Sequence, residues 1–84
     1  RDREPMTTLT DRDHTILQLA AARYRHPAQR EADALEQLEL RPTAFWAAVH
    51  RLLDHPAALA AYPADVRRLQ RLREARRRHR SGRM

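Results

Sequence analysis

The fold of this chain is decided by residues 34–53, which read ALEQLELRPTAFWAAVHRLL. Apolar residues at helical spacing lead up to Leu38, and Pro42 then prevents one continuous helix because proline lacks an N–H and clashes with the preceding turn. Proline suits the first position of a new helix, so a second helix is predicted to begin at Pro42. The three residues between the helices form a tight turn with Leu40 as a buried plug, and the stretch predicts a helix-turn-helix.

The helix that begins at Pro42 is predicted to bury one face and to present the other to solvent. The DNA major groove, about 12 Å wide, admits a helix whose outward side chains are short or can hydrogen-bond to base edges. Arg51 is expected to contact guanine or a phosphate, and Thr43 a phosphate or a thymine methyl group. The buried residues are predicted to be Phe45, Val49, Leu52 and Leu53. The base or groove contacts are predicted to be Thr43, Ala44, Ala47, His50 and Arg51.

Three observations count against a DNA-binding motif. Helical bundles show the same apolar spacing for packing reasons alone, and this turn carries Glu39 where a glycine is common. The helix before the turn is also acidic, and it would repel phosphates if it lay against the DNA backbone. The acidic residues of this helix are Glu31, Asp33 and Glu36, and Glu39 lies in the turn.

The rest of the chain shows helical periodicity as well. The predicted fold class is all-α: a small helical bundle that contains the helix-turn-helix, with a long basic C-terminal helix. The first helix is expected to follow a Thr10 N-cap, with Asp13 in the capping-box position, and to run to about Arg25. The other expected segments are a helix over 27–38, a short helical turn over 57–61 anchored by Leu59, and a last helix from Pro63 to about His79 that Ser81 and Gly82 stop.

The apolar positions of these segments supply the remaining predicted core. In the first helix they are Ile16, Leu17, Ala20, Ala21 and Tyr24. In the second they are Ala28, Ala32 or Ala34, Leu35 and Leu38, and in the last they are Val66, Leu69 and Leu72. Phe45 is expected in the core, and Trp46 either in the core or on a partner surface.

Charge is distributed very unevenly along the chain. Residues 1–66 carry eight arginines and ten acidic residues, a net charge of −2, whereas residues 67–84 carry nine arginines and one acidic residue, a net charge of +8. A segment this cationic is complementary to a polyanion, because neutralised phosphates release counterions. The alternative is a solvated tail that aids solubility. The predicted phosphate-binding residues are Arg41, Arg67, Arg68, Arg71, Arg73, Arg76, Arg77, Arg78 and Arg80.

Composition argues against several functional classes. The chain has 84 residues and no cysteine, which excludes a disulfide framework, a zinc ribbon and a thiol nucleophile, and its single glycine excludes a glycine-rich phosphate loop. His50 and Asp54 lie one helical turn apart, but a catalytic zinc needs a third ligand, so a surface ion pair is the preferred interpretation. We expect a cytoplasmic protein that is not an enzyme and has no metal, no cofactor and no membrane span.

Read end to end, the sequence resembles a family of small actinobacterial proteins, the domain-of-unknown-function family numbered 3263. The resemblance extends from about Leu9 to Arg80, and its most specific part is the stretch RLLDHPAALA at residues 51–60. Other matching stretches are LTDRD at 9–13, LRPT at 40–43 followed by Phe45 and Trp46, and VRRLQRLR at 66–73. The resemblance implies a helix-turn-helix protein similar to DNA-binding region four of sigma factors, and it implies no catalytic residues.

These observations together predict a small DNA-binding protein, a transcriptional regulator or accessory factor that would be nucleoid-associated. Its organisation is predicted as a disordered segment at 1–8, a helix-turn-helix domain at 9–62, and a basic helix and tail at 63–84. One alternative is a module that binds RNA polymerase or a sigma factor through Trp46, Leu59 and Tyr62. Another is an RNA-binding protein, because arginine-rich helices bind structured RNA. The oligomeric state is left open.

Overall fold

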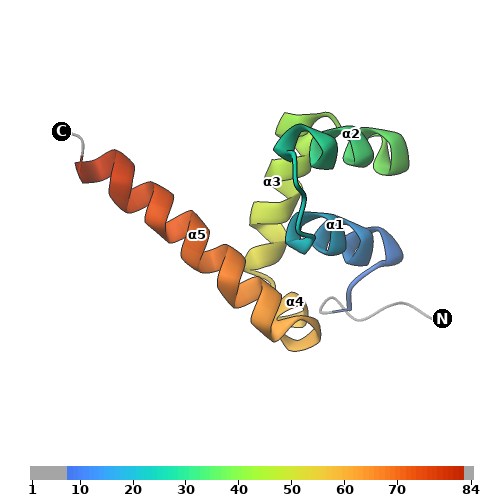
Figure 1. Ribbon diagram of the computed structural model, residues 1–84. Helices are drawn as coiled ribbons and strands as arrows, with labels where there is room; N and C mark the ends of the chain where they lie inside the picture. The colour runs from blue at the N-terminus through green and yellow to red at the C-terminus, as the bar shows by residue number, and fades with distance from the viewer. Residues whose placement is uncertain (1–7, 83–84) are drawn as a thin grey trace.

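The fold is built from helices throughout the part of the chain that can be described. The computed structural model describes residues 8–82, with side chains up to His79. In this range its elements are α1 (Asp11–Ala21), α2 (Pro27–Leu38), α3 (Pro42–Leu53), α4 (Pro56–Ala61) and α5 (Pro63–Gly82) (Figure 1). The predicted all-α bundle is confirmed. The segment predicted to be disordered lies outside the described residues except for Thr8, and so does the side chain of Arg80.

The helices begin where the sequence places caps and prolines. Thr10 accepts a hydrogen bond from the Asp13 amide at 3.0 Å, and the Asp13 carboxylate accepts one from the Thr10 amide at 3.1 Å, so the predicted capping box is present. The other helices all start at a proline, which has a suitable φ and no N–H to leave unsatisfied. Prolines therefore mark the starts of α2, α3, α4 and α5.

Two helix ends differ from the prediction. α1 ends at Ala21 and not near Arg25, because Ala22 already has an extended backbone with ψ of 149°. Tyr24 consequently lies in the connection to α2, where it is half-buried and donates a hydrogen bond to Asp33 at 2.6 Å. At the other end of the chain, α5 continues to Gly82, so Ser81 does not stop it.

The turn between α2 and α3 takes an unusual backbone conformation at Glu39. Its φ of 59° and ψ of 34° are left-handed, a region that glycine enters without the steric cost that other residues incur. The Glu39 amide bonds to the Leu35 carbonyl oxygen at 2.9 Å, which ends α2, and Leu40 packs half-buried against the core. α2 and α3 cross steeply after this turn, in the predicted helix-turn-helix arrangement (Figure 1).

The hydrophobic core lies between the first three helices and the start of α5. Phe45, Val49 and Val66 are its largest fully buried side chains, and Leu19, which the prediction omitted, is buried with them. The other buried residues are Leu9, Ile16, Leu17, Ala20, Ala34, Leu38, Ala48, Leu52, Leu53 and Ala58. The core is therefore formed largely by the faces predicted for it.

Several predicted core positions are wrong. Leu35 is 49% exposed, because α2 turns the face that carries Ala34 and Leu38 towards the bundle and leaves Leu35 on the flank. Leu72 is 48% exposed, because α5 has left the bundle by that point. Ala28 is exposed and Ala21 is half-buried. Other predictions hold: of the alternatives Ala32 and Ala34 it is Ala34 that is buried, and Leu59 and Leu69 are half-buried and pack against the core.

Long polar side chains from neighbouring helices satisfy the C-terminal carbonyl groups of the first three helices. Arg30 of α2 donates to the Leu19 and Ala22 carbonyl oxygens at 2.9 and 2.6 Å, and Arg68 of α5 donates to that of Ala21 at 2.7 Å. α1 has no basic residue in its own last turn, so these two arginines supply the positive charge that its dipole favours.

The C-terminal carbonyl groups of α2 and α3 also accept hydrogen bonds from side chains of neighbouring helices. Arg12 of α1 donates to the Leu38 carbonyl oxygen at 3.0 Å, and Gln70 of α5 donates to that of Leu53 at 2.7 Å. Each such bond joins two helices and satisfies a group that would otherwise be unpaired. These long polar side chains thus help to hold the helices together around a small core.

α5 begins inside the bundle and leaves it. Its first turns contact α1, α3 and α4, and its C-terminal half projects away from the other helices (Figure 1). The projecting half carries most of the arginine cluster predicted to bind phosphate. Of the helices in residues 8–82, none combines the length and apolar character needed to cross a bilayer.

Candidate nucleic-acid interface

The outward face of α3 carries the residues predicted to contact DNA. Phe45, Val49, Leu52 and Leu53 face the core, as predicted, and Ala48 joins them. The predicted base or groove residues are all exposed: Thr43, Ala44, Ala47, His50 and Arg51. These positions follow the helical repeat along the side opposite the core. The structure therefore places all five on one accessible surface, with short side chains at its N-terminal end.

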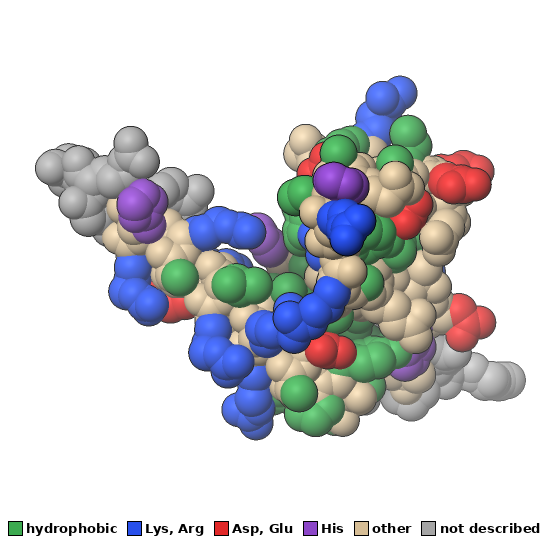
Figure 2. Space-filling view, in the orientation of Figure 1, with side chains coloured by type: hydrophobic (Ala, Val, Ile, Leu, Met, Phe, Trp, Pro, Cys, Tyr) green, Lys and Arg blue, Asp and Glu red, His purple; other side chains and the backbone are tan. Residues whose placement is uncertain are grey.

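The arginines of α5 divide into two groups by the side of the helix on which they lie. Arg73, Arg76 and Arg77 line a hollow shared with His50 of α3, so they face the bundle. Arg67 and Arg71 line a shallow surface on another side of α5, and Arg73 borders both surfaces. Figure 2 shows blue side chains along the helix and a hollow between its projecting half and the bundle. The sequence alone treats these arginines as one cluster, whereas the structure separates them.

Some of the predicted phosphate-binding arginines have partners inside the protein. Arg73 forms a two-pronged pair with the Asp54 carboxylate at 2.8 and 3.3 Å, and it also reaches the His50 carbonyl oxygen at 3.4 Å. Arg68 bonds the end of α1 and lies 3.6 Å from Asp65. The prediction that Asp54 pairs with His50 is therefore wrong, because α5 brings a stronger bidentate partner to this carboxylate.

Other predicted phosphate-binding arginines remain available. Arg77 and Arg78 lie 3.7 and 3.9 Å from Glu74, which are weak pairs on the surface. The predicted residues that are exposed and form no ion pair or side-chain hydrogen bond with a residue of 8–79 are Arg41, Arg67, Arg71 and Arg76. These guanidinium groups can therefore contact a phosphate without breaking a bond to a described residue.

Two acidic residues of α2 accept hydrogen bonds within the protein. Glu31 accepts a hydrogen bond from the Trp46 indole at 3.0 Å. Asp33 accepts bonds from Tyr24 at 2.6 Å and Gln29 at 2.8 Å. Only Glu36 and Glu39 of the four acidic residues near the turn are exposed and form no side-chain hydrogen bond with a described residue. Because the Trp46, Tyr24 and Gln29 donors are neutral, they do not offset the carboxylate charges, and the expected repulsion of phosphates by α2 remains.

The three residues of the alternative partner surface are all partly buried. Trp46 packs edge-on against Phe45, with ring centroids 4.9 Å apart, and it is half-buried. Tyr62 lies at the α4–α5 junction, where its hydroxyl is 2.7 Å from His14 Nδ1, and half-buried Leu59 belongs to α4. All three side chains pack against the hydrophobic core.

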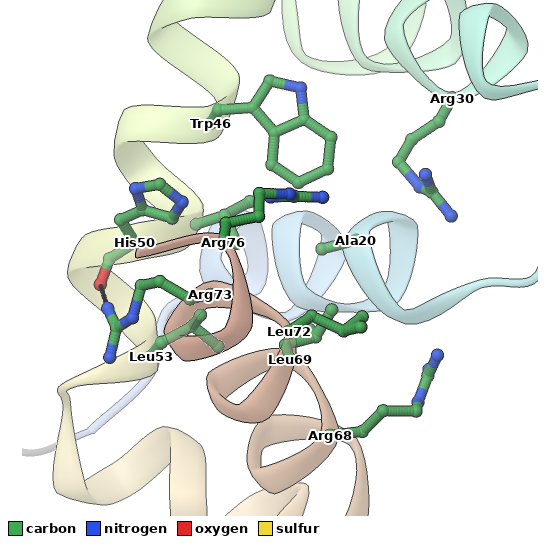
Figure 3. Close-up of a pocket in the computed structure, with 11 residues that line it drawn as sticks. Ala20, Arg30, Trp46, His50, Leu53, Arg68, Leu69, Leu72, Arg73 and Arg76 are labelled. Atoms are coloured by element: carbon green, nitrogen blue, oxygen red, sulfur yellow. Dashed lines mark hydrogen bonds between the residues drawn. The ribbon is translucent and has the colours of Figure 1, made fainter. Parts of the chain in front are cut away.

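A cleft between α3 and α5 is the feature that sequence reasoning missed. It encloses about 100 Å³ and is lined by residues of α1, α2, α3 and α5 (Figure 3). Arg30 of α2 is part of its wall, although nothing in the sequence connects this residue with the C-terminal arginines. Only the packing of the helices brings these positions together.

Two carboxylates on the bundle surface make stability depend on pH. The hydrogen bonds from Tyr24 and Gln29 lower the pKa of Asp33 from 3.8, and the one from Arg73 lowers the pKa of Asp54 from 3.8. Tyr24, as the donor, has its own pKa raised. Because the carboxyl pKa values are lower in the folded state, their contribution is complete above the unfolded pKa and is lost as the pH falls through the folded one.

We therefore expect the variant Asp33→Asn/Asp54→Asn to be less stable than the wild type at pH 6 and closer to it at pH 2.5. Urea titration at both pH values gives the two free energies of unfolding. Asp11→Asn is the control, because Asp11 is an exposed carboxylate that lies outside both hydrogen-bond groups. A difference between variant and wild type that stays constant with pH would contradict the expectation.

Comparison with known proteins gives one match. A sequence model of the family described as "Protein of unknown function (DUF3263)" matches residues 8–81. This range contains α1 to α4 and all but the last residue of α5. No curated protein and no solved structure matches the chain at a significant level.

Proposed function

We propose that this chain, which belongs to the DUF3263 family of proteins of unknown function, is a small DNA-binding protein. In the proposed complex α3 enters the major groove and arginines of α5 contact the phosphates beside it. The observation that carries the proposal is the position of the exposed face of α3 next to the cationic side of α5, since His50 and Arg76 line the same hollow. Neither surface alone would distinguish a DNA-binding protein from a helical bundle with a basic tail.

The shape of α3 supports groove entry. A helix with its side chains is about 10–12 Å across, and the major groove is about 12 Å wide, so bulky outward residues would keep the helix out. The exposed residues of the first two turns are Pro42, Thr43, Ala44 and Ala47, and none of them has a long side chain. Arg51 follows on the same side and offers a guanidinium to guanine or phosphate. Ala44 and Ala47 offer no hydrogen bonds, so we expect phosphates to supply most of the affinity.

The electrostatics of α5 support phosphate contact. Residues 67–84 carry a net charge of +8, and the described arginines spread over more than one side of the projecting helix. Like charges at this density repel one another, and a polyanion relieves that repulsion while counterions are released. A solubility tail would need no fixed position relative to α3, whereas α5 is held to α3 by Gln70 and Arg73.

We propose that the protein acts as a transcriptional regulator or accessory factor in the cytoplasm, associated with the nucleoid. The resemblance to region four of sigma factors supports this role, as does the helix-turn-helix arrangement of α2 and α3. Binding to RNA polymerase, to a sigma factor or to RNA are the competing proposals. Co-purification with polymerase after nuclease treatment would favour the first two over DNA tethering.

The test is a fluorescence-anisotropy titration with a mixed-sequence DNA duplex over a series of salt concentrations. We expect binding that weakens steeply with salt, and we expect the triple variant Arg76→Ala/Arg77→Ala/Arg78→Ala to reduce the slope of log K against log salt by at most about 0.9 per lost contact. An RNA duplex of the same sequence is the matched ligand, because it carries the same phosphates but a major groove too deep and narrow for α3. Equal or tighter RNA binding, or no DNA binding at low salt, would refute the proposal.

A further inference from the structure

We propose that the cleft between α3 and α5 is a phosphate site, in which one backbone phosphate of the bound duplex lies between His50 and Arg76. This inference rests on the proposed DNA-binding function and makes it more specific, since it assigns phosphate contact to one side of α5. The required ligand chemistry is a phosphate group. The source we propose is a phosphodiester of the DNA strand that borders the groove occupied by α3.

The lining of the cleft favours an anion. Its basic residues come from three helices and are Arg30, His50, Arg68, Arg73 and Arg76. The described lining contains no carboxylate. Two carboxylates, Glu31 and Asp54, lie beside the lining. Asp54 is paired with Arg73, and Glu31 accepts a hydrogen bond from the neutral Trp46 indole, so the arginines of the lining still outnumber the carboxylates beside it. A cleft of about 100 Å³ exceeds the roughly 30 Å³ taken by one water molecule, so it has room for a tetrahedral oxyanion.

Three of these cations are fixed in place by the fold. Arg30 and Arg68 are held by carbonyl oxygens at the end of α1, and Arg73 is held by Asp54. Each guanidinium has five N–H donors, so these bonds leave donors free. The carbonyl groups do not offset the charges of Arg30 and Arg68, whereas the Asp54 carboxylate offsets that of Arg73. Because the charges are held before a ligand arrives, they attract an anion without a further cost of ordering side chains.

Arg76 and His50 are the groups that can close on the phosphate. Both are exposed, and neither side chain has a hydrogen-bond or ion-pair partner among the described residues. In Figure 3 the Arg76 side chain extends beneath the Trp46 indole, and His50 stands on the α3 side of the same opening. An imidazole can donate a hydrogen bond when it is neutral or charged, and an arginine can bind a phosphate through two N–H groups.

The position of His50 connects the cleft with the groove-facing surface. It follows Ala47 by three residues and precedes Arg51, so it lies at the edge of the exposed face of α3. A strand that borders the groove around α3 would pass this edge and enter the space below the projecting half of α5. Trp46 and the half-exposed Leu72 give this space an apolar wall against which a deoxyribose can pack.

The test compares arginines on two sides of one helix. Arg76→Ala and His50→Ala should each weaken duplex binding about tenfold and reduce the salt slope, with a loss of about 0.9 for the arginine. Arg71→Ala is the matched control, because Arg71 is also an exposed and unpaired arginine of α5 but lies outside the cleft lining. It should weaken binding about threefold or less. Circular dichroism verifies that each variant is folded.

The only tryptophan of the chain gives an independent readout. Trp46 lines the cleft, so iodide, an anionic quencher, should reach it efficiently in the free protein and poorly once the duplex is bound. Neutral acrylamide controls for simple burial. Protection from iodide that is lost in Arg76→Ala and kept in Arg71→Ala supports the site. Equal losses of affinity in both variants, with unprotected Trp46, overturn the site while leaving the DNA-binding function intact.

A final experiment tests whether the site binds a phosphate of DNA or a free phosphate ligand. If the wild-type chain binds no duplex at low salt, the proposed function fails, and inorganic pyrophosphate becomes the probe. Quenching or enhancement of Trp46 emission by pyrophosphate in the wild type, absent in Arg76→Ala, would support a phosphate site for a free ligand. No response of Trp46 to either duplex or pyrophosphate would overturn the cleft proposal.

Discussion

Ala47→Glu is expected to weaken binding of duplex DNA by about a hundredfold or more while leaving the fold intact. Ala47 is exposed near the middle of the proposed groove-facing side of α3. A carboxylate there would lie between two phosphate backbones, and like charges brought together at an interface cost several kcal/mol, where about 1.4 kcal/mol is tenfold in affinity. Glutamate is a good helix former, so the change should not unfold α3. Anisotropy titration at low salt measures the loss.

Two matched variants separate charge, size and position. Ala47→Gln adds the same bulk without a charge, and we expect it to retain most of the binding. Ala60→Glu adds the same charge at an exposed position of α4, away from the N-terminal half of α3 (Figure 1), and should have a small effect. Wild-type affinity in Ala47→Glu would show that α3 does not enter the groove, whatever the arginines of α5 do.

Arg30→Ala is expected to lower the free energy of unfolding by about 2–4 kcal/mol, a large share of the stability of so small a domain. The guanidinium bonds two carbonyl oxygens at the end of α1, at 2.9 and 2.6 Å, and it lies 4.8 Å above the centre of the Tyr24 ring. Its loss removes charge-assisted hydrogen bonds and a cation–π contact together, and leaves two carbonyl groups without their partner. Urea denaturation followed by circular dichroism gives the change.

Two control variants separate the hydrogen bonds of Arg30 from its charge. Arg30→Lys retains the charge but cannot bridge two carbonyl groups with a planar fork, so it should recover only part of the stability. Arg23→Ala removes an exposed arginine from the same connection, and it should change stability by about 0.5 kcal/mol or less. If Arg23→Ala cost as much as Arg30→Ala, net charge rather than the bonds to α1 would be responsible.

The helices were predictable because their signals are local. The Thr10–Asp13 capping box and the prolines at 27, 42, 56 and 63 act through bonds and clashes within a few residues, and so they mark helix starts without knowledge of the fold. The exposed face of α3 was predictable for the same reason, since it follows from the helical repeat of Phe45, Val49 and Leu52. The helix starts and the helix-turn-helix therefore follow from the sequence alone.

The contacts of individual arginines could not be predicted from the sequence, because they depend on the tertiary structure. Arg68 and Arg73 read as members of one basic run, yet the first bonds the end of α1 and the second bonds Asp54. Arg30, which the sequence did not single out, lies in the same cleft as Arg76. A guanidinium can reach partners several ångströms from its backbone, so its role is set by which helix ends arrive there, and that is a property of packing.

The sequence by itself determined the helices, the helix-turn-helix and the concentration of positive charge at one end, because each depends on neighbours in the chain. Only the tertiary structure decided that Leu35 and Leu72 stay exposed, that α5 leaves the bundle, and that His50 and Arg76 share a cleft. Those outcomes depend on the angles at which helices cross and on how far each one extends past its neighbours. Such angles arise from contacts between residues far apart in the chain, which no local pattern records.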